Sequence, residues 1–177
     1  TFRVRTRSRD GVQRDYALRR AQPGLVAGSQ GQLSTSAEVA LLRLAQSAGV
    51  PVPNVICELE PRHDLGEGYL MEWLEGETLG HRIVKLPELA EMRATLAYEC
   101  GQTLAKIHAL PVPHSLRRVL HCVSPEVLVR ETWDAYIALN TPQPMIDFTA
   151  QWLLSHLPTT VTQCLVHGDF RNGNLMV

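Results

Sequence analysis

Hydrophobic and polar residues alternate over the first twenty positions, as they do in β-strands. Phe2 and Val4 are separated by arginines, and Tyr16 and Leu18 repeat this alternation. The dipeptide Asp10-Gly11 lies between the two runs, and a tight hairpin turn needs residues that tolerate positive φ. The pattern therefore predicts two antiparallel strands joined by a hairpin.

A helix is expected after the hairpin and a loop rich in Gly, Ser and Gln at residues 24–34. Thr35 and Glu38 have the spacing of a capping box, in which Thr35 caps the helix and Glu38 is its third residue. Apolar residues then recur at helical spacing until Gly49 ends the pattern.

The remaining pattern changes from strands to helices near residue 76. Two apolar runs predict strands at 55–59 and 69–74, separated by a turn. Helical spacing follows at 89–107, 125–139 and 145–158. Short apolar runs at 164–166 and 175–177 predict strands on either side of a polar loop. Strands followed by helices indicate an α+β architecture in two lobes that join near residues 72–77.

Composition is typical of a globular protein and excludes few functions. Of 177 residues, 45% are hydrophobic and 20% charged, and the net charge of -1 gives no sign of a nucleic-acid or membrane partner. Four widely spaced cysteines indicate reduced, mostly buried thiols. Without a membrane-spanning apolar run or a secretory signal, we expect a cytoplasmic protein. The oligomeric state stays open.

Arginines are concentrated at the start of the chain, where seven of the first twenty residues are arginine. Two interpretations fit this cluster. The arginines can form a solvated strand face, or some of them can line an anion site.

The most specific chemical signal is His167-x-Asp169-x-x-x-x-Asn174. Phosphoryl transfer to a hydroxyl needs a carboxylate that accepts a proton and oxygen ligands for Mg²⁺. The protein-kinase catalytic loop has the same interval between its aspartate and asparagine. Two glycines, Gly168 and Gly173, permit a tight loop. We predict Asp169 as the general base and Asn174 as a magnesium ligand; the alternative is an ordinary polar turn.

These residues resemble the catalytic loop of the aminoglycoside phosphotransferase and choline-kinase-like superfamily. The segments YALRRAQPG, VPVPNV, YLMEWLEGETL and LAKIHAL look like family segments in the same order, so the resemblance covers nearly the whole chain. It is closest to the branch of kinase-like domains associated with acyl-CoA dehydrogenases.

The resemblance implies a protein-kinase-like two-lobe fold, with an antiparallel-sheet N-lobe containing one helix and a helical C-lobe. Residues 1–76 correspond to the nucleotide-binding lobe without its first strand and phosphate loop, and residues 77–177 to a partial C-lobe that ends in the catalytic loop. We therefore expect the fold to be incomplete at both ends and this stretch alone to be inactive.

The resemblance also implies nucleotide-binding residues. Arg19 stands where such kinases carry the lysine that holds the α- and β-phosphates, and Arg20 is the alternative. Glu38 matches the helix glutamate that pairs with this cation, although it also fits the capping box. Glu72 and Leu74 fall at the hinge that binds the base through its backbone, and Met71 lies behind the base or fills the core.

The function implied is magnesium-dependent transfer of the γ-phosphate of ATP or GTP to a hydroxyl of a small molecule. Gly168 replaces the arginine of the protein-kinase motif, which favours a small-molecule acceptor. Candidate acceptors are a hydroxyacyl-CoA-type metabolite, an aminoglycoside or a choline-like alcohol. The rival hypothesis is a pseudokinase-like module that binds a nucleotide or a partner without turnover, and the arginine at position 19 supports it.

Overall fold

A computed structural model of the chain describes residues 1–21 and 33–177. The predicted loop at 24–34 lies almost wholly outside these residues. Contacts divide the chain into two compact units, of which the first contains Thr1–Val119 with Cys164–Val177 and the second Leu120–Gln163. The division between lobes at residues 76 and 77 is not tested by these units and stays a prediction.

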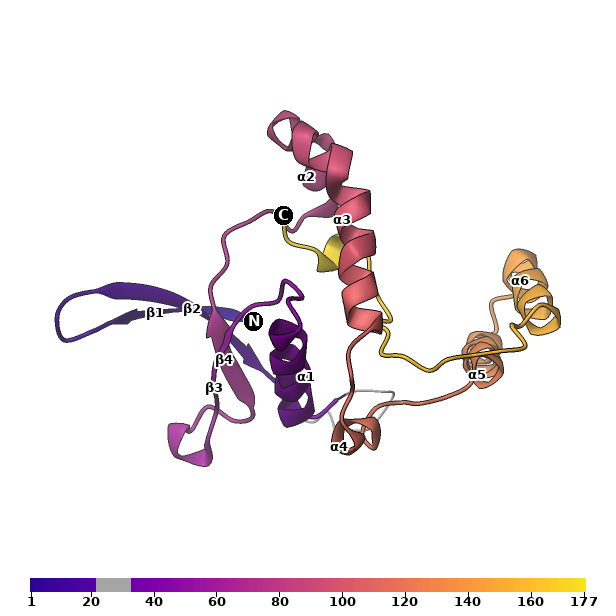
Figure 1. The fold of residues 1–177 in the computed structure, drawn as a ribbon, viewed down its shortest axis with the longest axis horizontal. Helices are drawn as coiled ribbons and strands as arrows, with labels where there is room; N and C mark the ends of the chain where they lie inside the picture. Colours follow the sequence, from indigo (N-terminus) through magenta and orange to yellow (C-terminus); the bar gives the residue numbers. More distant parts are fainter. Residues whose placement is uncertain (22–32) are drawn as a thin grey trace. The chain divides into compact units, whose positions relative to one another are not determined.

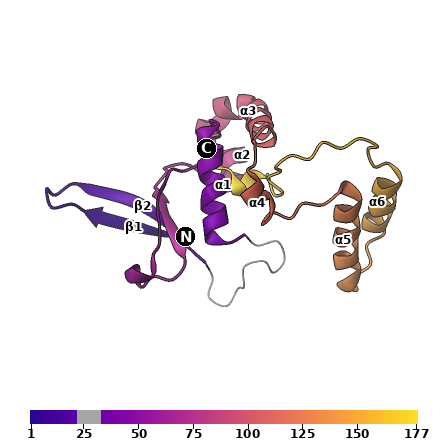
Figure 2. The ribbon, with the colours of Figure 1, turned by 60° about the horizontal axis from the view of Figure 1, so that its bottom comes forward.

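The first unit contains a four-stranded antiparallel sheet. Its strands are β1 (Phe2–Arg7), β2 (Gln13–Arg20), β3 (Val55–Glu58) and β4 (Gly68–Glu72), in the order β1-β2-β4-β3 (Figure 1). The predicted hairpin is confirmed, with Gly11 at φ 87° in the turn between β1 and β2. The hairpin extends beyond the rest of the sheet (Figure 2).

One helix, α1 (Thr35–Ser47), packs against β3 and β4 through its apolar face. Val39 is fully buried and forms a small core with Val55 and Tyr69. Leu42 and Met71 are partly buried against the same core. Burial of these side chains fixes α1 on one face of the sheet.

The start of α1 differs from the prediction by one residue. Ser34 is the N-cap, and its hydroxyl accepts a hydrogen bond from the amide of Ala37 at 3.2 Å. The third residue of the helix is therefore Ala37, and Glu38 follows it. The capping box predicted from Thr35 and Glu38 is therefore wrong. Ser34, one residue before Thr35, already caps the helix with its hydroxyl.

Helical elements follow β4 in the first unit. They are α2 (Gly80–Lys85), α3 (Ala90–His108) and α4 (His114–Arg117), with short 3₁₀ turns η3 (Pro87–Leu89) and η4 (Asn172–Asn174). A further 3₁₀ turn, η2 (Pro61–His63), lies between β3 and β4. The helix predicted at 89–107 is confirmed as α3. Its end packs Ile107 against Ala45 and Val50 of the segment around the end of α1. Lys106 Nζ also donates to the carbonyl of Gly49 at 3.0 Å.

The two short strands predicted around the polar loop are wrong, since neither 164–166 nor 175–177 is a strand in the described chain. Leu165 packs against the core at the end of α3, whereas Val166 is 62% exposed. At the C-terminal end, Val177 exchanges two backbone hydrogen bonds with Glu77, of 2.8 and 3.1 Å. This single pairing replaces the expected strand.

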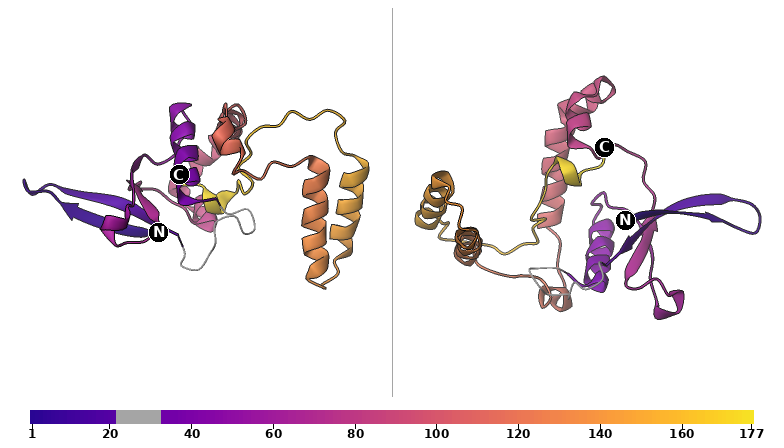
Figure 3. Two further views of the ribbon diagram at one scale, coloured as in Figure 1. Left: turned by 90° about the horizontal axis from the view of Figure 1, so that it is seen from below. Right: turned by 180° about the vertical axis from the view of Figure 1, so that it is seen from behind.

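The second unit is a helical hairpin of α5 (Pro125–Ala138) and α6 (Pro144–Ser155), which lie side by side (Figure 3). Both helices were predicted, with ends three residues or fewer from those observed. The indole of Trp133 donates to Asp147 at 3.1 Å and so links the two helices.

The four cysteines are free thiols, as expected, but the prediction that most are buried is wrong. Cys57, Cys122 and Cys164 are exposed and Cys100 is partly buried. Among the helices in the described residues, none combines the length and hydrophobicity that a membrane crossing requires.

Gly68 allows β4 to approach β2 closely, and its replacement is expected to destabilise the sheet. A Cβ at Gly68 would lie 2.3 Å from the carbonyl oxygen of Arg19, so backbone would have to move. We expect Gly68→Ala to lower the free energy of unfolding by about 1–3 kcal/mol.

The matched control is Gly101→Ala in α3, where a Cβ meets nothing within 4 Å. This variant should be up to about 1 kcal/mol more stable, because alanine favours the helix. Urea unfolding of both variants measures the contrast. Equal stability of Gly68→Ala and wild type would contradict the close approach.

Candidate active site

The loop that carries Asp169 is shaped by its glycine and its histidine. Gly168 has φ 80°, a conformation that favours glycine, and it turns the chain sharply before Asp169. The amide of Asp169 donates to Nδ1 of His167 at 3.3 Å, and the ring of His167 meets Phe170 edge-on at 5.4 Å. His167 thus supports the loop through this hydrogen bond and this ring contact.

Asp169 and Asn174 lie in direct contact. Nδ2 of Asn174 donates to the backbone carbonyl of Asp169 at 2.8 Å and to its Oδ2 at 2.7 Å. Arg171 Nε donates to Oδ1 at 2.9 Å. The Asn174 hydrogen bond is the main cause that lowers the pKa of Asp169; slight desolvation opposes it and Arg171 reinforces it.

An exposed, ionised carboxylate at this position can accept a proton. Each oxygen of Asp169 accepts one hydrogen bond from Asn174 or Arg171, and a carboxylate oxygen has two lone pairs. Capacity therefore remains on both oxygens for an incoming hydroxyl group.

The loop fits a hard cation in its chemistry and offers part of a coordination sphere. Because Asn174 uses Nδ2 toward Asp169, its Oδ1 is left as a candidate ligand, and amide and carboxylate oxygens suit Mg²⁺. No cluster of three or more His, Cys, Asp or Glu side chains that could hold a metal exists among residues 1–21 and 33–177.

Two glycines allow the loop to approach the segment after β4 closely, because they have no side chain. A Cβ at Gly80 would lie 3.1 Å from Cβ of Asn172, and one at Gly76 would lie 2.6 Å from Cγ of Met176. Glu77, which lies between them, makes the backbone pairing with Val177. The residues around Asn174 are therefore fixed to the segment 76–80.

Arg19 and Glu38 form the second predicted pair. Arg19 Nη2 lies 2.8 Å from Glu38 Oε1, and Arg19 Nε donates to Oε2 at 3.1 Å. Burial lowers the pKa of Arg19, but the hydrogen bonds and the charge of Glu38 outweigh it, so that the pKa is raised. Glu38 therefore faces Arg19 and forms no capping box with Thr35, and its role toward a nucleotide stays a prediction.

Tyr69 completes this cluster, and sequence reasoning missed it. It lies opposite Arg19 in the pairing of β2 with β4 and is 2% exposed. Burial raises the pKa of its hydroxyl to about 12, and the neighbouring Glu38 carboxylate adds to the rise. Its position opposite Arg19 could be predicted only from the register between β2 and β4. The hydrophobic pattern of the sequence alone does not define that register.

Arg20, the alternative to Arg19, lies elsewhere. It stands opposite Gly68, and a Cβ at Gly66 would lie 3.4 Å from its Nη2. Its guanidinium is therefore beside the turn between β3 and β4. No contact between Arg20 and Glu38 occurs in the described chain.

The predicted hinge residues differ in their surroundings. Met71 is partly buried against the core under α1, which supports its role as core filler. Glu72 is tied to Asn54, since its amide donates to the Asn54 carbonyl at 2.9 Å and its Oε1 accepts the Asn54 amide at 2.8 Å. In the described residues, neither the amide nor the carbonyl of Leu74 makes a hydrogen bond, so both can meet a ligand.

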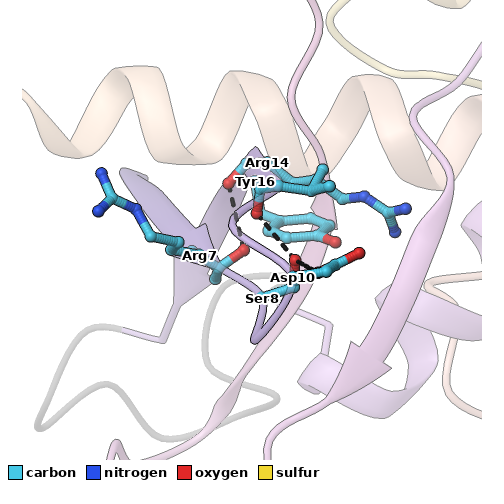
Figure 4. Close-up of a pocket in the computed structure, with 7 residues that line it drawn as sticks. Arg7, Ser8, Asp10, Arg14 and Tyr16 are labelled. Atoms are coloured by element: carbon cyan, nitrogen blue, oxygen red, sulfur yellow. Dashed lines mark hydrogen bonds between the residues drawn. The ribbon is translucent and has the colours of Figure 1, made fainter.

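A small pocket lies in the β1–β2 hairpin, and none of the predicted site residues lines it (Figure 4). Arg7 and Arg14 line it, and Ser8 bonds to Asp10 across it. Arg3 and Arg5, by contrast, are paired with Asp15. The arginine cluster of the sequence is thus divided between ion pairs and this pocket, and both interpretations of it stay open.

The structure brings Arg19 to Glu38 and Asp169 to Asn174. Between these two pairs the described residues provide no direct contact. Arg171 contacts the carboxylate of Asp169.

Comparison with known proteins gives a family and several relatives. The model of the phosphotransferase enzyme family matches residues 1–177. Acyl-CoA dehydrogenase family member 10 of Mus musculus is 30% identical over 93% of this chain and 16% of its own length. The probable acyl-CoA dehydrogenase IBR3 of Arabidopsis thaliana is 29% identical over 99% of this chain and 22% of its own. Acyl-CoA dehydrogenase family member 11 of Rattus norvegicus is 28% identical over 91% and 21%.

The chain spans about a fifth of the length of these relatives. The α+β kinase-like fold expected from the motifs is confirmed, as is the likeness to the acyl-CoA dehydrogenase branch. The aminoglycoside type of enzyme finds no support among these relatives.

Proposed function

The chain belongs to the phosphotransferase enzyme family, and from this premise we propose that it moves the γ-phosphate of ATP or GTP to a hydroxyl group of a small molecule. The observation that carries the proposal is the pair of Asp169 and Asn174, in which the amide nitrogen of Asn174 donates to an exposed carboxylate and favours its ionised form. A base and a hard-cation ligand side by side are the two groups that phosphoryl transfer requires.

In the proposed reaction, Asp169 accepts the proton of the acceptor hydroxyl while the hydroxyl oxygen attacks the γ-phosphorus in line. The bond between the γ-phosphorus and the β-phosphate oxygen breaks, and ADP or GDP leaves. Asn174 Oδ1 would hold Mg²⁺, which neutralises charge on the phosphates. Asn174 Nδ2 and Arg171 meanwhile orient the carboxylate of Asp169. The backbone groups of Leu74 would bind the base.

Arg19 is proposed to hold the phosphates while Glu38 fixes its orientation. Glu38 contacts Nε and Nη2 of Arg19 and uses at most one N–H group of each. Because a guanidinium has five N–H groups, at least three remain for phosphate oxygens. Arginine can therefore serve at a position where lysine is expected. Glu38 then acts as a positioning residue and does not itself touch the nucleotide.

Arg19→Ala is expected to weaken nucleotide affinity by about 10–100-fold, the usual range for a lost hydrogen bond to a charged group. Arg20→Ala is the matched control, because Arg20 lies beside the Gly66 turn, and it should change affinity by less than about twofold. Titration with ATP and with GTP measures both variants. A larger loss in Arg20→Ala would move the phosphate role to that residue.

The acceptor class proposed is a hydroxyacyl-CoA-type metabolite. The support is that the relatives described above carry acyl-CoA dehydrogenase in their names. Along the sequence, the acidic residues of α3 and α5 are spread out, a pattern that does not favour a polycationic acceptor; they are Glu91, Glu99, Glu126, Glu131 and Asp134.

The test is a turnover screen of the full-length protein with ATP and GTP against hydroxyl-bearing metabolites, including hydroxyacyl-CoA compounds, an aminoglycoside and choline. We expect Mg²⁺-dependent phosphorylation of a hydroxyacyl-CoA-type compound. Turnover of the aminoglycoside alone would refute the acceptor class, and absence of any phosphoryl transfer would refute the enzyme.

The second candidate is a pseudokinase-like module that binds nucleotide without turnover. Arginine at position 19 favours it, because the kinases that the sequence resembles carry lysine there and arginine does not substitute for the point charge of a lysine. Nucleotide binding in titration together with no transfer in the screen would support this candidate.

A further inference from the structure

A cluster of charged and aromatic side chains joins β1 to the segment that follows β4. The guanidinium carbon of Arg3 lies 4.5 Å from the centre of the Trp73 ring, and Arg3 Nη2 lies 3.6 Å from Glu75. The indole of Trp73 donates to Glu75 Oε1 at 2.7 Å. One arginine therefore contacts two of the three residues Trp73, Leu74 and Glu75.

Arg3 lies on the face of the sheet that carries Arg19. Arg3 pairs with Ala17, and Ala17 pairs with Met71, so these three side chains share a face. Met71 packs against the core under α1, which identifies this face as the one covered by α1. Arg19, two residues after Ala17 on β2, points to the same side.

Asp15 on β2 also binds Arg3. Arg3 Nε donates to Asp15 Oδ2 at 3.0 Å, and Arg5 binds the same carboxylate through Nε at 2.7 Å and Nη2 at 3.0 Å. The hydrogen bonds of Arg5 first, and then those of Arg3, hold the pKa of Asp15 well below its usual value. Asp15 therefore anchors Arg3 through these hydrogen bonds, which favour its ionised form.

We propose that Arg3 is a positioning residue for the purine base of the nucleoside triphosphate, which it serves by fixing the segment Trp73–Glu75. This inference rests on the proposed function, in which the backbone of Leu74 binds the base. Cation–π contact with Trp73 and charge attraction to Glu75 restrain the residues on both sides of Leu74. A segment ordered in advance loses less entropy when the base binds.

Arg5 supplies the matched control, because it binds Asp15 as Arg3 does, while in the described residues it contacts neither Trp73 nor Glu75. In the full-length protein, Arg3→Leu should raise the Kd for ATP in the presence of Mg²⁺ by about tenfold. The kcat at saturating ATP should stay within about twofold, and Arg5→Leu should change Kd by less than about twofold. Equal losses in both variants, or none in either, would overturn the proposal.

A readout without nucleotide keeps this test separate from the proposed function. In a background where every tryptophan except Trp73 is replaced by phenylalanine, Trp133 and Trp152 included, the fluorescence of Trp73 reports the segment directly. Arg3→Leu should increase acrylamide quenching of Trp73, and Arg5→Leu should not. If the wild-type protein binds neither ATP nor GTP, the proposed function is refuted. If Arg3→Leu leaves the acrylamide quenching of Trp73 unchanged, the proposal that Arg3 fixes the segment Trp73–Glu75 is refuted. Thermal unfolding of each variant excludes global loss of structure.

Discussion

Asp169→Asn is expected to lower kcat of the full-length protein by about 10²–10⁴-fold, the usual contribution of a general base. The amide keeps the size and the planar shape of the carboxylate but cannot accept the hydroxyl proton. Asp169 is proposed to take a proton from the acceptor hydroxyl and not to bind the nucleotide. The Kd for ATP should therefore change by less than about threefold.

Single-turnover and steady-state rates on the best acceptor from the screen measure this effect. Asp134→Asn, on the exposed side of α5, is the control for loss of one carboxylate and should retain the wild-type rate. If Asp169→Asn transfers phosphate as fast as wild type, the assignment of Asp169 as the base is wrong.

Asn174→Ala is expected to lower kcat/KM by about 10–100-fold, the cost commonly seen when support of a metal site is removed. The variant loses a proposed Mg²⁺ ligand and, at the same time, two hydrogen bonds to Asp169. The Mg²⁺ concentration for half-maximal rate should therefore rise as well.

Asn172→Ala is the matched control for Asn174→Ala, because both residues lie in η4 and alanine keeps the Cβ that contacts Gly80. We expect near wild-type rates and an unchanged Mg²⁺ requirement for Asn172→Ala. The same rise in Mg²⁺ requirement for both variants would attribute the effect to the loop as a whole and not to a ligand at Asn174.

The elements with a long hydrophobic repeat could be predicted from the sequence. The hairpin around Gly11 and the helix α3 have such patterns, and both are present. The run at 164–166 could not be interpreted correctly because a short apolar run does not define its partner: Leu165 is partly buried against α3, and Val166 is exposed. Helix α2 has six residues, too few to show a helical period.

The candidate site was predictable in its residue types but less so in its contacts. The interval from Asp169 to Asn174 indicated the base and the ligand, but the hydrogen bond between them depends on the turn at Gly168. The contact of Arg3 with Trp73 depends on how three strands align, and that alignment is not visible in the alternation of any one strand.

The close contacts of Gly76 and Gly80 have a consequence for how this stretch can vary in evolution. Gly76 meets Met176 and Gly80 meets Asn172, so both ends of a five-residue stretch are fitted to the same loop. Inserting or deleting one residue between them would withdraw one glycine and place a side chain against the loop. Among homologues, insertions and deletions should therefore occur mainly at the tip of the β1–β2 hairpin, where a Cβ at Gly11 would meet nothing within 4 Å.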